Sequence, residues 1–187
     1  MLNQIAALHG TGVAASTNSY ESIATVSLSG TQTTITFSSI PSTYKHLQLR
    51  ANVRGAGGAW NFLTFNGDTT QSNYYAHELA GNGSSAYANA YAGGSSPKGI
   101  QLFVTYGFSN IFTGAVIDIL DYTSTNKAKT VRCLSGWDGN GTTPPGEVRL
   151  TSGLWSASPA AITSLSLVTN SGDYQQYSHF ALYGIKG

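Results

Sequence analysis

Charged side chains are scarce in this sequence. Only 9% of its 187 residues are Asp, Glu, Lys or Arg, whereas ordinary soluble domains carry roughly 25%. Nine Lys and Arg nearly balance eight Asp and Glu, so the chain has no strong field to attract nucleic acid or an anionic membrane. A charge-poor, nearly neutral surface tends to self-associate. This composition therefore indicates a protein that works inside a large assembly.

Cysteine is almost absent too. The single Cys133 excludes an intrachain disulfide and a thiolate metal cluster. It lies in KTVRCLS, a segment typical of a strand, with no flanking His or acidic residue. We therefore expect a small buried side chain rather than a reactive thiol.

Long apolar runs are missing as well. No segment approaches the ~18 apolar residues of a membrane span. The first ten residues contain no Lys or Arg, and their apolar run is too short for a secretory signal. We expect no membrane insertion, and a protein made in the cytoplasm without processing.

What the sequence does contain is a regular alternation of apolar and polar residues from Glu21 onward. Turn residues interrupt it about every 8–12 positions, a pattern typical of sandwiches and barrels. In the clearest strand, 46–54, Leu47, Leu49 and Val53 share one face. The sequence predicts an all-β, antiparallel β-sandwich of about ten strands over residues 21–187. A jelly roll is favoured over other Greek-key sandwiches.

Two segments carry more specific expectations. Residues 21–28 and 33–37, joined by the short connection 29–31, are predicted to form a hairpin. Residues 81–97 are too rich in Gly, Ser and Ala for a regular element. They are predicted to form a long surface loop.

Residues 111–122 are apolar on both faces of a predicted strand. Ile117 and Ile119 share one face, and Val116 and Leu120 share the other. A subunit interface at Val116 and Leu120 explains this pattern. A β-bulge that shifts the phase of the strand explains it equally well.

Catalytic patterns are not found. The four histidines form no recognised ligand spacing. The adjacent His77 and Glu78 would project to opposite faces of a strand, and so would Asp118 and Asp121. Opposite faces are unsuited to paired acid and base catalysis, so we expect a protein that is not an enzyme and holds no cofactor.

Residues 138–147 superficially resemble a calcium-binding loop. An EF-hand needs Gly at its sixth position and Glu at its twelfth. Here Thr143 stands sixth and Glu147 tenth. Two Asx-Gly turns before a pair of prolines account for the segment better, so we expect no metal.

The aromatic residues allow two interpretations. Trp60, Tyr87, Tyr91 and Trp137 could line a surface that stacks on sugar rings, because aromatic faces pack well on apolar CH groups. Their mixture with Asn, Ser and Thr around residues 73–91 suits glycan contact. The more ordinary interpretation, which we favour, is that Tyr and Trp fill a sandwich core and its interfaces.

Residues 1–20 precede the alternating pattern and are predicted to form an anchoring arm. Leu2, Ile5 and Leu8 recur every three residues, so a short helical turn would present them on one side to a partner. The Gly- and Ala-rich residues that follow would let that turn reach away from the domain. A strand or cap over the open end of the sandwich is nearly as well supported.

The sequence contains the ordered phrases SYESIATVSL, ITFSSIPSTYKHLQLRANVR, VIDILDYTSTNKAKTVRCLSG, LTSGLWSASPAAITSLSL and FALYGIKG. Together they resemble a group of tailed-bacteriophage virion proteins. The resemblance covers nearly all of residues 19–187 and has no catalytic signature.

This resemblance implies a jelly-roll module that decorates a capsid or forms part of a tail or fibre, usually as a homotrimer. It implies other virion proteins as partners, and assembly in the cytoplasm of the host bacterium. The alternative is a carbohydrate-binding module of the virion that recognises a host surface glycan. A glycan hydrolase ranks last, because the sequence has no evident acid pair.

Overall fold

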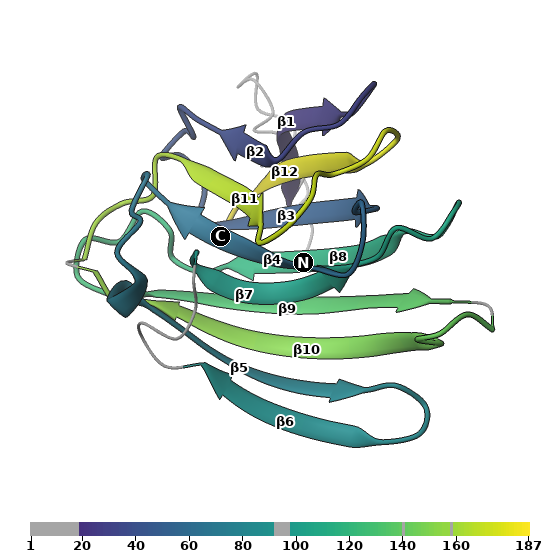
Figure 1. The fold of residues 1–187 in the computed structure, drawn as a ribbon. Coiled ribbons are helices and arrows are strands. Elements are labelled where there is room, and N and C mark those ends of the chain that lie inside the picture. The colour runs from purple at the N-terminus through teal and green to yellow at the C-terminus, as the bar shows by residue number, and fades with distance from the viewer. Residues whose placement is uncertain (1–18, 92–97, 140, 158) are drawn as a thin grey trace, which may run out of the picture.

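The computed structural model describes residues 19–91, 98–139, 141–157 and 159–187. The chain forms two antiparallel β-sheets that pack face to face (Figure 1). The larger sheet has the order β1-β12-β3-β8-β9-β10-β5-β6, and the smaller has the order β2-β11-β4-β7. A single 3-10 turn, η2 (Gln71–Asn73), interrupts the strands of the described chain.

The strands of the larger sheet are β1 (Tyr20–Ser27), β3 (His46–Val53), β5 (Tyr74–Gly81), β6 (Ala86–Tyr91), β8 (Thr113–Ile119), β9 (Lys129–Asp138), β10 (Gly146–Trp155) and β12 (His179–Ile185). Those of the smaller sheet are β2 (Thr34–Phe37), β4 (Ala59–Phe65), β7 (Ile100–Thr105) and β11 (Leu165–Thr169).

Eight of these strands form a jelly roll. The four strands β1-β12-β3-β8 pack over β2-β11-β4-β7, and the chain crosses between the two sheets from β1 to β2, β2 to β3 and β3 to β4. Two hairpins are inserted into this framework, β5–β6 between β4 and β7, and β9–β10 between β8 and β11. Both hairpins join the larger sheet beyond β8, and we call these four strands the extension.

The sandwich class is confirmed, with twelve strands rather than about ten. The predicted core strand is correct as well, because Leu47, Leu49 and Val53 are fully buried between the sheets. On the opposite face Gln48 is also buried, and its Nε2 donates a hydrogen bond to Asp118 at 2.8 Å that satisfies the buried amide.

The predicted hairpin of residues 21–28 and 33–37 is wrong. β1 pairs with β12 in the larger sheet, whereas β2 pairs with β11 in the smaller one. Each partner lies more than a hundred residues away in the chain. Alternation identifies a strand and its buried face, but it does not identify the neighbouring strand.

The predicted loop of residues 81–97 is also wrong in part. β6 (Ala86–Tyr91) pairs along its whole length with β5, and the Asn82 side chain closes the turn by accepting hydrogen bonds from the backbone N–H groups of Ser84 and Ser85. Pairing with a long neighbouring strand outweighs the low strand propensity of Ala, Asn and Gly.

β8 contains no β-bulge. Its pairings with β3 and β9 run without interruption from Thr113 to Ile119. Of the two explanations for the two-faced apolar pattern, the bulge is therefore wrong.

Candidate functional site

The inner face of the extension carries a small cleft at one end of the sandwich. The smaller sheet contributes β4, β7 and the segment after β7, and the extension contributes β6 and β10. The cavity has a volume of about 220 Å³. The side chains that line this aromatic cleft are Trp60, Tyr87, Val104, Tyr106, Glu147 and Arg149.

Strand register brings these residues together. Tyr87 lies opposite Ala80 on β5, and Ala80 lies opposite Arg149 on β10. Directly paired residues share a face of the sheet, so Tyr87 and Arg149 point to the same side, two strands apart. The guanidinium of Arg149 faces the Trp60 ring of the opposing sheet, with its central carbon 4.5 Å from the ring centroid.

Arg149 is the centre of a buried polar network beneath the cleft. Its side chain is 3% exposed and forms ion pairs with Glu78 and Glu147. Its Nε donates to Glu147 Oε1 at 2.9 Å, and its Nη2 donates to the Tyr87 hydroxyl at 3.0 Å. Burial alone would lower the pKa of Arg149, but its hydrogen bonds to the two carboxylates outweigh burial and raise the pKa.

Two tyrosines and an asparagine complete the network. The hydroxyl of Tyr91 donates to Glu78 at 2.9 Å, and the Asn89 amide donates to the same carboxylate at 2.7 Å. Tyr87 donates to Glu147. Burial, followed by this hydrogen bond, raises the pKa of Tyr87 to about 12. These groups therefore hold one another in fixed positions.

The sequence did not predict that Glu78 and Glu147 would meet. They are brought together by the pairing of β5 with β10 and share one guanidinium. The Glu78 side chain is 1% exposed and so does not face the cleft, whereas Glu147 is 18% exposed and does. The sequence pattern places both residues on the inward-facing side of their strands. It cannot show that they meet, because that requires knowing which strands are paired.

Two further aromatic rings stand beside the cleft and pack on Tyr106. Tyr106 packs against Trp137 with ring centroids 4.3 Å apart and against Phe108 at 5.6 Å. Phe108 also lies 5.7 Å from Trp137. All three rings are partly exposed, so they form a continuous aromatic surface from Tyr106 in the cleft to Trp137 on β9.

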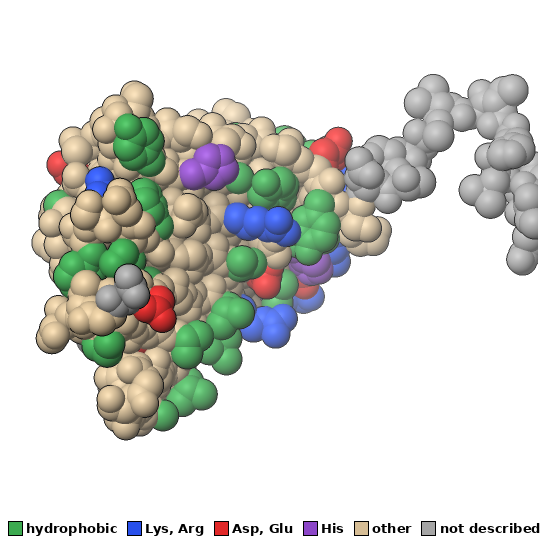
Figure 2. Space-filling model, turned by 90° about the vertical axis from the view of Figure 1, so that its right-hand side faces the viewer, with side chains coloured by type: hydrophobic (Ala, Val, Ile, Leu, Met, Phe, Trp, Pro, Cys, Tyr) green, Lys and Arg blue, Asp and Glu red, His purple; other side chains and the backbone are tan. Residues whose placement is uncertain are grey.

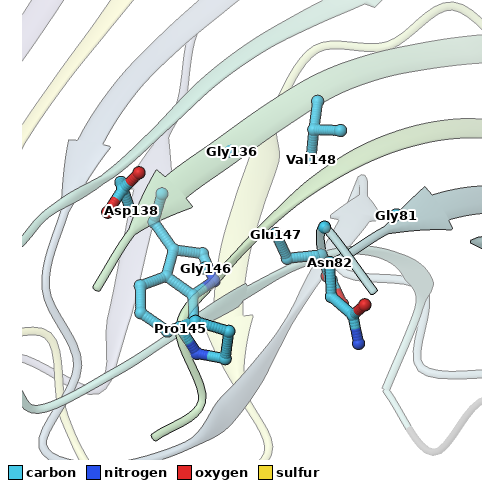
Figure 3. Close-up of a pocket in the computed structure, with 10 residues that line it drawn as sticks. Gly81, Asn82, Gly136, Asp138, Pro145, Gly146, Glu147 and Val148 are labelled. Carbon is cyan, nitrogen blue, oxygen red and sulfur yellow. The ribbon is translucent and has the colours of Figure 1, made fainter. Parts of the chain in front are cut away.

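A second hollow of about 450 Å³ adjoins the aromatic cleft. Glu147 lines both spaces, and Trp137 lines the hollow and packs on Tyr106 of the cleft. In Figure 3, Asp138 and Pro145 lie on one side of this hollow and Asn82 lies on the other. Glycines line much of the remainder. Because they have no side chains, backbone groups border the space.

The four aromatic residues that the sequence singled out for glycan contact thus lie in one region. Trp60 and Tyr87 share the aromatic cleft, and Trp137 adjoins it through Tyr106. Tyr91 is partly buried and reaches the same network through Glu78. Sequence reasoning missed Tyr106, Phe108 and Arg149.

The outer face of the extension is different, because it is apolar and exposed. Nine large hydrophobic residues are exposed in the described chain. Six of them lie on this surface and Val116 adjoins them on β8, and we call these seven residues the apolar face. Its members are Tyr75, Leu79, Val116, Leu134, Val148, Leu150 and Leu154. Hydrophobic side chains accordingly line the lower right-hand side of the molecule in Figure 2.

A cross-strand row forms the centre of the apolar face. Val116 lies opposite Leu134, Leu134 opposite Leu150, and Leu150 opposite Leu79. Their exposed fractions are 39%, 58%, 51% and 56%. With strands about 4.8 Å apart, the row is roughly 15 Å long.

The two residues predicted for a subunit interface have different positions. Val116 lies in the row. Leu120 belongs to the turn after β8 and is partly buried, with its backbone N–H bonded to the Thr130 carbonyl. Residues 1–18 of the predicted arm, including Leu2, Ile5 and Leu8, lie outside the described residues, whereas Tyr20 at its end already belongs to β1.

The remaining titratable groups have structural roles. Cys133 is buried as predicted, and burial raises the pKa of its thiol to about 12. Asp121 lies in a turn, with ion pairs to Lys127 at 2.8 Å and Lys45 at 3.1 Å. Within the described residues, no group of three or more His, Cys, Asp or Glu could hold a metal ion, and no helix is long and apolar enough to cross a membrane.

Comparisons with known proteins identify no relative of this chain. No protein-family model, no curated protein and no solved structure matches it.

Proposed function

We propose that the protein is a non-enzymatic structural subunit of a tailed-bacteriophage virion, and that it assembles as a homotrimer through its apolar face. The carrying observation is that seven of the nine exposed large hydrophobic residues in the described chain share this one surface. The virion assignment rests on the sequence phrases that resemble phage virion proteins. The assembly assignment rests on the surface itself.

The physical argument starts from solvation. Monomeric proteins rarely expose contiguous apolar patches of more than a few hundred Å², and larger ones mark interaction sites. Covering half-exposed Leu side chains gains roughly 25 cal/mol for each Å² removed from water. The central row of Val116, Leu134, Leu150 and Leu79 contains no polar side chain to oppose that gain.

A second copy of the chain is the partner that fits this surface. The row carries no charge, so it requires no oppositely charged partner. The described chain offers no other apolar surface of comparable size, so the matching patch on a neighbour is the same face. Around a threefold axis, the Val116 end and the Leu79 end of the row would contact different neighbours.

The edge of the sheet supports the same interpretation. β6 is the edge strand of the extension and contains no charged residue, no proline and no bulge. Monomeric proteins commonly protect edge strands with such devices. An unprotected edge beside an apolar face is compatible with burial in an assembly.

The arm formed by residues 1–20 is proposed to attach the subunit to another virion protein through Leu2, Ile5 and Leu8. Deletion of residues 1–18 tests this role, because the first strand begins only at Tyr20. We expect the truncated protein to keep its melting temperature and to lose association with particles. A melting temperature several degrees lower, or undiminished association, would contradict the role.

Electron cryomicroscopy of the virion whose genome encodes this chain tests the proposed function. We expect threefold clusters of jelly-roll density on the capsid or tail, with the apolar faces turned toward one another. Purified particles that lack the chain would contradict the virion assignment. Clusters with solvent-exposed apolar faces would contradict the assembly assignment alone.

A further inference from the structure

We infer that the aromatic cleft binds an uncharged saccharide. This site lies on the inner side of the extension, whereas the apolar face lies on the outer side of the same strands. The cleft itself is therefore separate from the assembly surface, and the adjoining hollow borders that surface at Val148.

The rings supply the first part of the argument. Trp60, Tyr87, Tyr106 and Trp137 are all partly exposed and gather at one end of the sandwich. A saccharide presents CH groups on one face and hydroxyls at its edge, so it packs on rings that offer apolar faces and polar tips. A surface rich in Leu and Val would serve a lipid or a protein, and that chemistry is confined to the other side of the extension.

The buried network supplies the second part. Arg149 fixes the Trp60 ring from below and bonds to the Tyr87 hydroxyl and to Glu147. A ligand therefore meets side chains that are already ordered, and little conformational freedom is lost on binding. Glu147, which is 18% exposed, is positioned to accept hydrogen bonds from sugar hydroxyls.

The charges supply the third part and select the class of sugar. Arg149 is the one cation among the residues of the cleft and of the adjoining hollow, and it is paired with both Glu78 and Glu147. Two carboxylates against one guanidinium leave the network negative, which disfavours sialylated, sulfated and uronic-acid glycans.

The size of the space sets the length of the ligand. The aromatic cleft, at about 220 Å³, is below the 300–1,000 Å³ that is usual for drug-sized ligands. It therefore suits a single sugar ring. The hollow of about 450 Å³ that adjoins it through Glu147 gives room for the next residues of an oligosaccharide.

The test uses the full chain on a glycan array that carries neutral oligosaccharides beside their sialylated, sulfated and uronic-acid forms. The strongest neutral glycan is then titrated, with Trp fluorescence and saturation-transfer NMR as readouts. We expect saturable binding of a neutral glycan and at least tenfold weaker binding of its acidic forms. An array with no neutral binder, or with equal or stronger acidic binding, overturns the inference.

Two variants locate the site. Tyr106→Ala removes a ring from the cleft and should weaken binding at least tenfold. Tyr177→Ala removes a ring that is 72% exposed and lies outside both the cleft and the apolar face, so it should leave affinity within twofold. Equal affinity for Tyr106→Ala and the wild type overturns the assignment of the cleft.

Glu147→Gln gives a second test, which does not depend on the loss of a ring. It keeps the shape of the side chain and removes one negative charge, so the ratio of acidic to neutral glycan affinity should rise severalfold. An unchanged ratio contradicts the electrostatic argument. Assembly state, measured on the same samples by light scattering, reports separately on the proposed function.

Discussion

The larger sheet has two halves that share one backbone geometry and differ on both faces. In the half formed by β1, β12, β3 and β8, the outer face is mostly polar, with Val116 of β8 as the exception beside the extension. Arg50 lies between the rings of Tyr20 and Tyr183 at 5.6 and 5.1 Å, and its Nε donates to Gln48. In the extension, the same outer face carries exposed aliphatic side chains.

One row of paired residues crosses both halves and makes the contrast direct. It begins with Thr25, Ala181 and Arg50, and continues through Val116 to the leucines of the extension. The exposed side chains therefore change from polar to apolar along a single row that crosses the sheet. The framework strands therefore present a mostly polar outer surface, whereas the inserted hairpins present exposed aliphatic side chains.

The inner faces differ in a corresponding way. Beneath β1, β12, β3 and β8 the inner side chains are aliphatic and aromatic core residues. Beneath β10 and β5 the inner side chains include the ionised network of Arg149, Glu78 and Glu147. The extension thus buries an ionised network on its inner face and exposes aliphatic residues together with Arg132 on its outer face, whereas the charges of the framework lie outside its core.

The largest expected effect comes from breaking the inner network. Arg149→Met leaves Glu78 buried without its cation, and removing one partner of a buried ion pair typically costs about 3–5 kcal/mol. Urea denaturation measures this loss. Arg132→Met, on the exposed face of the adjacent β9, is the matched control and should change stability by less than about 0.5 kcal/mol. Similar losses for the two variants would contradict the structural role of Arg149.

The next effect probes the framework. Leu49→Ala removes a fully buried side chain and should cost about 2–5 kcal/mol through lost burial and the remaining cavity. Gln48→Ala removes the hydrogen bond to Asp118 and should cost only about 1 kcal/mol. Both are read from denaturation midpoints. Equal losses would refute the register assigned to β3.

The smallest effect concerns a turn of the framework. Hydrogen bonds from Lys127 and Lys45 lower the pKa of Asp121 from 3.8 to about 2. Since the folded pKa is depressed, ionised Asp121 stabilises the protein above about pH 4, and this contribution is lost as the pH falls toward 2. Asp121→Asn should therefore melt earlier than the wild type at pH 5, and the difference should shrink by pH 2. A difference that is constant with pH would argue against these ion pairs.

How far the sequence predicted this molecule depends on whether the feature is local. The buried face of β3 follows from the alternation of Leu47, Leu49 and Val53, and Val116 was correctly placed on an outward face. The partners of β1 and β2 are strands that are distant in the chain, whereas β6 depends on its pairing with the neighbouring β5, which outweighs its low strand propensity. The cleft was suspected from its aromatic residues, but its ionic centre joins β5 and β10 and cannot be found without their register.

The outer row offers the most direct test of the central claim, that the extension is an assembly surface. Multi-angle light scattering at micromolar concentration compares the wild type with Leu134→Lys in the apolar half and Thr25→Lys in the polar half of the same row. The account predicts the mass of three chains for the wild type and for Thr25→Lys, and the mass of one chain for Leu134→Lys with an unchanged melting temperature. A monomeric wild type, or a Leu134→Lys variant that remains a trimer, would contradict it.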